Sequence, residues 1–196
     1  MLDYGIGNLR SAQKALARVG ADARLVADPA QARGAAGVVL PGVGAFGRCM
    51  EALRCSGLDR VALDAVEEGR PFLGICVGAQ MLYRRSEEDP GVAGLGVLDG
   101  SVRRLPEGEK RPQMQWNLVT ARRPSRLLGP AGSQAWMYFV HSFAPEPTED
   151  TVGVCDYGGE VVAAAERGTV WATQFHPEKS GREGLALLAR FVAACG

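Results

Sequence analysis

The pattern of hydrophobic and polar positions in the first half of the chain differs from that in the second half. In the first half, short apolar runs at residues 37–40 and 72–75 predict buried strands, and a further short strand is expected at residues 23–26. Asn8 can cap a first helix that Gly20 closes. Helices are predicted around these strands at residues 8–19, 48–54 and 58–68.

The second half has the pattern of strands joined by turns, such as Tyr157-Gly158-Gly159, followed by a helix at residues 182–194. Strand–helix alternation followed by antiparallel strands predicts an α/β fold, a doubly wound sheet with a β-rich extension. We expect residues 1–196 to form a single domain with a sizeable core. The strands of this half are expected at residues 97–105, 117–120, 136–140, 152–155, 161–165 and 170–175.

Composition narrows the classes of function. The 22 basic residues balance the 22 acidic ones, and no basic block is present, which argues against nucleic-acid binding. The apolar runs are too short for a membrane span or a signal peptide, so we expect a cytoplasmic protein without membrane contact. The five cysteines have neither disulfide-framework nor zinc spacing, which predicts reduced thiols and no metal site.

One cysteine stands where a strand is expected to turn directly into a helix. The apolar run opened by Pro71 ends at Cys76, and residues 77–83 are compatible with a helix. Gly74 and Gly78 lie two residues before and after this cysteine, which is the nucleophile-elbow spacing with sulfur in place of oxygen. The glycines allow close packing beside a strained nucleophile, and the helix start favours a thiolate. The alternative is a small core cysteine, the commoner case.

The base that such a thiol needs has few candidates, because the chain has only two histidines, His141 and His176. Pro177 favours an extended backbone at His176, and residues two apart in an extended segment share one side, so Glu178 can face the imidazole. A thiol, an imidazole and a carboxylate form the cysteine version of a catalytic triad. In the alternative interpretation, Glu178 is a solvated charge and His176 a turn residue.

Residues 42–47 read Gly-Val-Gly-Ala-Phe-Gly, a literal dinucleotide-binding pattern between a strand and a helix. Such a site needs an acid at the end of the next strand, where Cys76 stands, so we reject this interpretation. The loop can instead aim an N–H of Val43 or Gly44 at an oxyanion, with the N–H of Val77 as the second donor. Its glycines also leave the Gly42–Val43 peptide free to flip, which could switch the oxyanion hole on or off.

The Gly-x-Cys-x-Gly elbow and the His-Pro-Glu sequence resemble the class I, triad-type glutamine amidotransferases. Within that class the chain resembles the glutaminase subunits of imidazole glycerol phosphate synthase along its whole length. The resemblance is carried by residues 3–11, 41–47, 86–88, 112–117 and 174–180, in this order.

This resemblance implies a flavodoxin-like fold of the class I amidotransferase type. It implies hydrolysis of L-glutamine to glutamate and ammonia through a Cys76 thioester, without a metal or organic cofactor. It also implies a heterodimer with a (β/α)8 cyclase subunit. The cyclase would use the ammonia to form imidazole glycerol phosphate and aminoimidazole carboxamide ribonucleotide (AICAR) in histidine biosynthesis.

The resemblance further assigns residues outside the triad. In the family, the positions of Gln80 and Glu88 hold the amino-acid head of the substrate, and the backbone of residues 139–143 grips its carboxylate. Tyr138 would lie near the route taken by ammonia. The substrate-binding residues expected on this basis are Gly42, Gln80, Glu88, His141, Ser142 and Phe143. The partner interface is expected to include Asn8, Trp116, Tyr138 and Lys179.

The chain departs from the family pattern at two places. Gln115 replaces the usual glycine, which bears on the local geometry of the interface. Only Met1 and Leu2 precede Asp3, where family members carry a fuller first strand, so we expect the stability of the fold to be lower.

Two alternative functions are open at this stage. One is a class I glutaminase of another pathway, such as vitamin B6 synthesis; the blocks at residues 3–11 and 112–117 argue against it. The other is an inactive binding module of the same fold, which the presence of Cys76, His176 and Glu178 disfavours.

Overall fold

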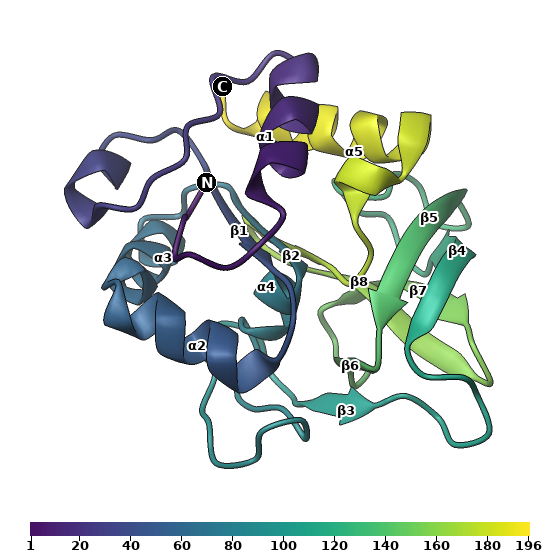
Figure 1. Ribbon diagram of the computed structural model, residues 1–196. Helices are drawn as coiled ribbons and strands as arrows, with labels where there is room; N and C mark the ends of the chain where they lie inside the picture. Colours follow the sequence, from purple (N-terminus) through teal and green to yellow (C-terminus); the bar gives the residue numbers. More distant parts are fainter.

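The computed structural model describes residues 1–196 and is built around one seven-stranded sheet with strand order β1-β2-β9-β8-β7-β4-β5 (Figure 1). Its strands are β1 (Val38–Gly42), β2 (Phe72–Cys76), β4 (Gln113–Ala121), β5 (Gln134–His141), β7 (Thr151–Asp156), β8 (Glu160–Arg167) and β9 (Val170–Thr173). A separate two-stranded sheet pairs β3 (Val102–Arg104) with β6 (Phe143–Pro145). The helices are α1 (Leu9–Arg18), α2 (Phe46–Cys55), α3 (Leu58–Glu67), α4 (Val77–Gln80) and α5 (Gly181–Ala194), with 3-10 turns η1 (Pro29–Ala32) and η2 (Pro177–Lys179).

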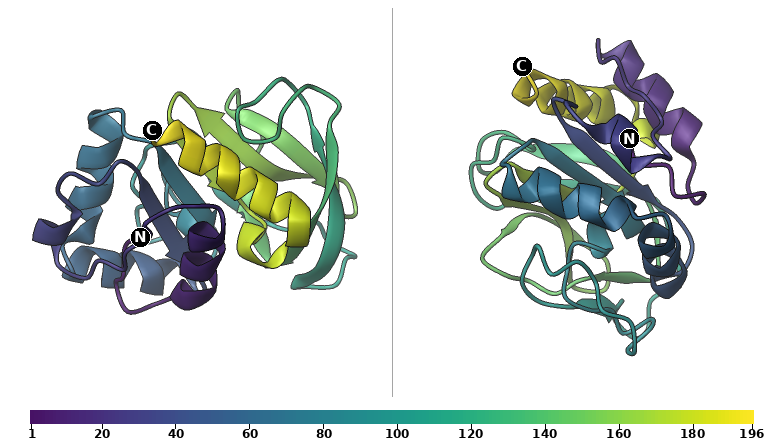
Figure 2. Two further views of the ribbon diagram at one scale, coloured as in Figure 1. Left: turned by 90° about the horizontal axis from the view of Figure 1, so that it is seen from above. Right: turned by 90° about the vertical axis from the view of Figure 1, so that its left-hand side faces the viewer.

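The parallel half of the sheet consists of β1, β2 and β9. Every residue of these three strands is buried, since helices lie on both faces: α1 and α5 cover one face, and α2 and α3 cover the other (Figures 1 and 2). Burial on both faces explains why these strands are continuous apolar runs. The predicted doubly wound α/β core is therefore present.

The antiparallel half runs from β9 through β8, β7 and β4 to the edge strand β5 and forms the predicted β-rich extension. β4 and β5 pair over eight positions, from Gln113↔His141 to Thr120↔Gln134. β4 meets β7 only at Thr120 and Ala121. The β4–β5 hairpin therefore extends beyond the rest of the sheet as an arm, and its outer face is free.

The strand expected at residues 23–26 is reduced to one bridge, Leu2↔Val26. The first residues lie between this segment and β1: Leu2 is buried and donates its N–H to Val39 O at 3.0 Å, and Asp3 donates to Val26 O at 2.9 Å.

Two further expectations differ from the structure. Only Val102–Arg104 of the expected strand at residues 97–105 is a strand, because the chain bends at Asp99-Gly100, where Gly100 has φ +94°. The helix expected at residues 77–83 ends early, as α4. Strand β6 and the two 3-10 turns were not predicted.

No helix has both the length and the apolar character needed to cross a membrane.

Candidate active site

Cys76 ends β2 and directly precedes α4, and it is the only non-glycine residue with a positive φ, at +55°. That backbone conformation is strained for an L-residue and typical of a nucleophile elbow. Both flanking glycines are sterically required. A Cβ at Gly74 would lie 2.8 Å from the Ala79 Cα, and a Cβ at Gly78 would overlap the Leu40 carbonyl oxygen.

A cavity of about 250 Å³ lies over this elbow. Its volume suits a small metabolite, since pockets for drug-sized ligands begin near roughly 300 Å³. All of its lining residues except Pro112 are site residues, or lie in the segment 139–143, that the sequence analysis singled out. The lining consists of Val43, Gly44, Cys76, Val77, Gln80, Glu88, Pro112, Val140, His141, Ser142, Phe143 and His176.

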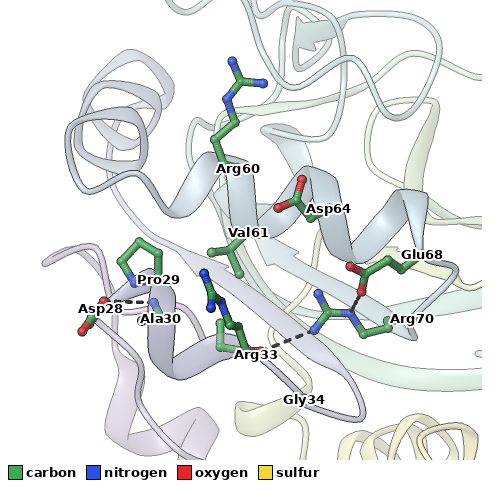
Figure 3. A pocket seen from close by; sticks show the side chains of 11 residues that line it. Asp28, Pro29, Ala30, Arg33, Gly34, Arg60, Val61, Asp64, Glu68 and Arg70 are labelled. Atoms are coloured by element: carbon green, nitrogen blue, oxygen red, sulfur yellow. Dashed lines mark hydrogen bonds and ion pairs between the residues drawn. The ribbon is translucent and has the colours of Figure 1, made fainter.

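A larger hollow of about 620 Å³ lies on the surface between η1 and α3 and carries none of this chemistry (Figure 3). Its three basic and three acidic side chains cancel in charge: Glu68 pairs with Arg70 at 2.7 Å, and the Asp28 carboxylate accepts the Ala30 N–H. The charged lining residues are Arg33, Arg60 and Arg70 opposite Asp28, Asp64 and Glu68. The smaller cavity at the elbow is therefore the candidate active site.

His176 and Glu178 form a buried pair beside the elbow. The Nδ1 of His176 lies 2.7 Å from Glu178 Oε1, and the two side chains are only 2% and 3% exposed. The carboxylate accepts the Nδ1–H, which leaves Nε2 as the basic nitrogen. Burial by itself lowers the pKa of His176, but the neighbouring Cys76 and Glu178 outweigh it and raise the pKa to about 9.

Ser180 holds this pair against β5. Its hydroxyl donates to the His176 carbonyl at 2.6 Å and accepts the Tyr138 N–H at 3.0 Å. The His176 N–H in turn donates to the Tyr138 carbonyl at 3.0 Å. The backbone of Tyr138 therefore positions the imidazole. Ser180 was not singled out from the sequence, although it ends the block at residues 174–180.

The sulfur of Cys76 has a second neighbour that the sequence did not indicate. Gln174 directs its Nε2 at Cys76 Sγ over 3.8 Å, and its Oε1 lies 2.9 Å from Gln80 Nε2. The same Gln80 Nε2 donates to Phe143 O at 2.9 Å. Since its NH2 group is engaged inside the protein, Gln80 presents only its oxygen to the cavity.

His141 is a buried brace and not a base. Nδ1 lies 2.8 Å from Phe143 O, to which it must donate, so Nε2 is an acceptor. Gln113 Oε1 lies 2.8 Å from this Nε2, and the Gln113 NH2 has no other partner, so a neutral ring requires the amide to be turned by 180° to present its NH2 to Nε2. Burial lowers the pKa of His141 to about 4, which keeps the ring neutral.

The residues predicted for the oxyanion hole surround the cavity. The Val43 carbonyl accepts a hydrogen bond from Cys49 Sγ at 3.3 Å, so the N–H of the same trans peptide, on Gly44, points away from Cys49. Val77 is the first residue of α4, so its N–H has no acceptor within the helix. Gly42 does not line the cavity. A Cβ there would lie 2.6 Å from the Gly78 nitrogen, so Gly42 lets β1 pack against the elbow.

Glu88 closes another side of the cavity. Its Oε2 accepts the N–H of Phe46, the first residue of α2, at 2.8 Å. The side chain is half-buried, and its other oxygen is free of protein partners. A carboxylate held in this way can bind an ammonium group.

The expected interface residues gather beside the arm formed by β4 and β5. Trp116 and Tyr138 face each other across the strands in an edge-on contact with ring centroids 6.2 Å apart. Lys179 Nζ lies 5.7 Å from the Tyr138 ring centroid, and α1, which Asn8 precedes, contacts η2. The large exposed hydrophobic side chains are Met114 (62%), Trp116 (47%) and Trp136 (56%), all on this arm. The exposure of Trp136 was not predicted.

The chain is similar to known proteins in sequence and in fold. The profile of the family Glutamine amidotransferase class-I matches residues 1–195. Imidazole glycerol phosphate synthase subunit HisH of Methanothermobacter thermautotrophicus is 48% identical over 193 residues, which cover 98% of this chain and 96% of the relative. The protein of that name in Deinococcus radiodurans is 48% identical over 195 residues, covering 97% and 91%.

Solved structures show the same fold at lower identity. A crystal structure of glutamine amidotransferase superimposes with a TM-score of 0.79 at 23% identity, covering 100% of this chain and 97% of the other. The structure of PurLQS from Thermotoga maritima gives a TM-score of 0.78 at 20% identity, covering 98% and 95%.

Proposed function

Since the chain belongs to the class I glutamine amidotransferases, and within them to the imidazole glycerol phosphate synthase subunits HisH, we propose that it is the glutaminase subunit of that synthase. It hydrolyses L-glutamine to glutamate and ammonia, and it passes the ammonia to a (β/α)8 cyclase subunit for the formation of imidazole glycerol phosphate and AICAR in histidine biosynthesis. The observation that carries this proposal is the buried His176–Glu178 pair at the cavity that contains the strained Cys76.

The first step is attack by the sulfur. Cys76 Sγ forms a bond to the side-chain carboxamide carbon of glutamine, and its proton goes to Nε2 of His176. The raised pKa of His176, about 9, supports an imidazole that holds this proton at neutral pH. Glu178 fixes the ring through Nδ1 and stabilises its positive charge.

The carbonyl electrons then move to the oxygen, which becomes an oxyanion. We assign its stabilisation to the Val77 N–H and to an N–H of the Val43–Gly44 loop, because both segments line the cavity beside Cys76. The Cys49 contact to the Val43 carbonyl favours Gly44 as the loop donor, since it turns the Gly44 N–H away from α2.

Collapse of this intermediate releases ammonia. His176 gives its proton to the departing nitrogen, the C–N bond breaks, and a γ-glutamyl thioester remains on Cys76. Nε2 then takes a proton from water as the water attacks the thioester. The S–C bond breaks, the proton returns to the sulfur, and glutamate is formed.

The amino-acid head of glutamine has matching partners in the cavity. The free oxygen of Glu88 and the Oε1 of Gln80 are acceptors for its ammonium group. Its carboxylate lies against the backbone of Ser142 and Phe143, with the neutral ring of His141 bracing that turn.

The β4–β5 arm is the surface that binds the cyclase. Trp116 and Trp136 are exposed there, and aromatic anchors of this kind dominate interface energies. Tyr138 belongs to the same arm and holds the His176 backbone, so a partner seated on it can bear directly on the base and on the exit of ammonia. Neither a glutaminase of another pathway nor an inactive binding module is favoured by any feature of the site.

The test is glutamine turnover and covalent labelling by the purified chain with its cyclase. Cys76→Ala and Cys76→Ser are expected to abolish turnover while partner binding persists, because only the nucleophile is removed. A glutamine-derived electrophile is expected to label Cys76 first, as detected by mass spectrometry, and Cys55→Ala is the matched control with full labelling. Preferential labelling of Cys49 or Cys155 would refute the assignment.

A further inference from the structure

Gln174 follows β9 directly and has no role in the steps above, yet it occupies the interior of the site. Gln174 is only 2% exposed, and its backbone N–H donates to Ala163 O at 2.9 Å, which fixes it to β8. The amide lies between the nucleophile and Gln80, at 3.8 Å from Cys76 Sγ and 2.9 Å from Gln80 Nε2.

The direction of this amide is set by a backbone carbonyl. Phe143 O can only accept hydrogen bonds, so the Gln80 group that lies 2.9 Å from it must be the NH2. That NH2 also lies against the Gln174 side chain, which must therefore present its oxygen to Gln80. The other end of the Gln174 amide, which faces the sulfur, is then a donor.

We propose that Gln174 is a catalytic residue that donates a hydrogen bond to the Cys76 sulfur and stabilises its thiolate form. This inference rests on the proposed glutaminase function for its substrate, but not for the contact itself. A hydrogen bond to an anion is stronger than one to a neutral group, so the donor favours the charged sulfur that attacks glutamine.

The same chain of hydrogen bonds joins Cys76 to Gln80, the residue proposed to bind the ammonium group of glutamine. Phe143 O, Gln80 and Gln174 form one series that ends at the sulfur. Substrate bound at the Gln80 oxygen therefore polarises the amide that contacts Cys76. Hydrogen bonds in series strengthen one another in this way.

Other charged and titratable groups surround the sulfur and have to be kept constant in any test. His176 faces it from the turn before η2, with Glu178 behind the ring. Glu88 lines the same cavity, and Tyr4 and Cys49 lie behind the elbow.

The experiment measures the pH dependence of iodoacetamide alkylation at Cys76, read by mass spectrometry so that the other cysteines do not contribute. Gln174→Met keeps the volume and removes the donor. Loss of a charge-assisted hydrogen bond of roughly 1.5 kcal/mol corresponds to an upward shift of the alkylation midpoint by about one pH unit. With the cyclase present, kcat for glutamine is expected to fall at least ~10-fold.

Thr173→Val is the matched control, because Thr173 is fully buried beside Gln174 and its hydroxyl bonds only to the Gly74 carbonyl, at 3.5 Å. Its alkylation midpoint is expected to stay unchanged. If Gln174→Met does not fold, Gln174→Asn serves in its place, since it retains the amide but draws it back from the sulfur; the same upward shift is expected.

An unchanged midpoint in the folded Gln174 variant overturns the proposal and makes Gln174 a packing residue. The alkylation needs neither glutamine nor the cyclase. Absence of glutamine turnover in the unmodified chain with its cyclase would therefore count against the proposed function alone, while the midpoint still decides the role of Gln174.

Discussion

At the scale of single residues, the site keeps polar atoms buried without partners. Nε2 of His176 and Oε2 of Glu178 are buried and make no hydrogen bond within the protein. Each unpaired buried polar atom costs about 1–3 kcal/mol, and folded proteins tolerate few of them. The strained backbone of Cys76 adds a similar cost. Such costs, concentrated around one thiol, are expected where a protein performs chemistry.

The two members of the buried pair are expected to differ in importance. His176→Asn removes the group that transfers protons and should lower kcat by on the order of 10⁴–10⁶. Glu178→Gln only weakens the orientation of the ring, so its loss should be smaller, roughly 10²–10⁴. Steady-state glutamine turnover with the cyclase measures both. His141→Asn is the matched control, and a far larger loss in it than in His176→Asn would reverse the roles of the two histidines.

The buried, neutral ring of His141 leads to a prediction about how the free energy of unfolding depends on pH. Burial lowers its pKa to about 4, below its ordinary value of 6.5, so only the unfolded chain takes up a proton between these values. The free energy of unfolding therefore falls as the pH drops from about 6.5 toward 4, by roughly 3 kcal/mol for this group.

Urea unfolding at pH 7 and pH 4.5 tests this dependence. His141→Asn cannot titrate, so it is expected to lose roughly 2–3 kcal/mol less on acidification than the unmodified chain. Equal losses in the two proteins would show that His141 is not held neutral.

At the scale of elements, the elbow depends on the close approach of β1, β2 and α4. α4 is a single short turn, Val77–Gln80, and cannot hold its position by its own hydrogen bonds. Its position comes from the contact of Gly78 with the Leu40 carbonyl of β1. Cys76, the proposed nucleophile, is thus placed by packing between elements.

Gly78→Ala is therefore expected to destabilise the fold by ~3 kcal/mol, because the new methyl group meets backbone that cannot move aside. Gly91→Ala is the matched control, since a Cβ there meets nothing within 4 Å. The midpoint of urea unfolding at an unchanged m-value measures the difference. Equal midpoints for the two variants would contradict the packing argument.

At the scale of the whole molecule, the β4–β5 arm connects an exposed aromatic face to the active site. Trp116 contacts Tyr138, and the backbone of Tyr138 holds His176 directly and through Ser180. Ammonia released to water at neutral pH is mostly ammonium and no longer nucleophilic, so coupling to a partner is chemically advantageous.

We expect weak glutamine turnover by the isolated chain and strong activation by the cyclase with its ribonucleotide ligand. Closer alignment of the loop N–H with the oxyanion by the bound cyclase would account for this activation, since one oxyanion donor is worth ~10²–10³ in rate. Trp116→Ala should weaken partner binding by about 2 kcal/mol, a roughly 30-fold rise in Kd measured by titration calorimetry. Arg60→Ala is the control: Arg60 lies on α3 in the surface hollow of Figure 3, and the Kd for the cyclase is expected to stay unchanged. Full turnover by the chain alone, unchanged by the cyclase, would exclude a gated subunit.

The sequence by itself determined the features that depend on local backbone geometry. The change from apolar runs to turn-separated strands predicted the α/β core and its β-rich extension. Gly74 and Gly78 predicted the elbow at Cys76, because a strained turn between strand and helix needs small neighbours at those positions. The pairing of His176 with Glu178 also follows locally, since an extended backbone places residues two apart on one side.

Only the tertiary structure decided the features that depend on distant segments. By count alone His141 was as good a base as His176, and burial against Phe143 and Gln113 makes it a neutral brace. Gln174 reaches the sulfur because β9 pairs with β2. Trp136 is exposed because the β4–β5 arm leaves the sheet. Periodicity along the chain records which residues share a face, but the segment that covers that face is set by strand pairing across the molecule.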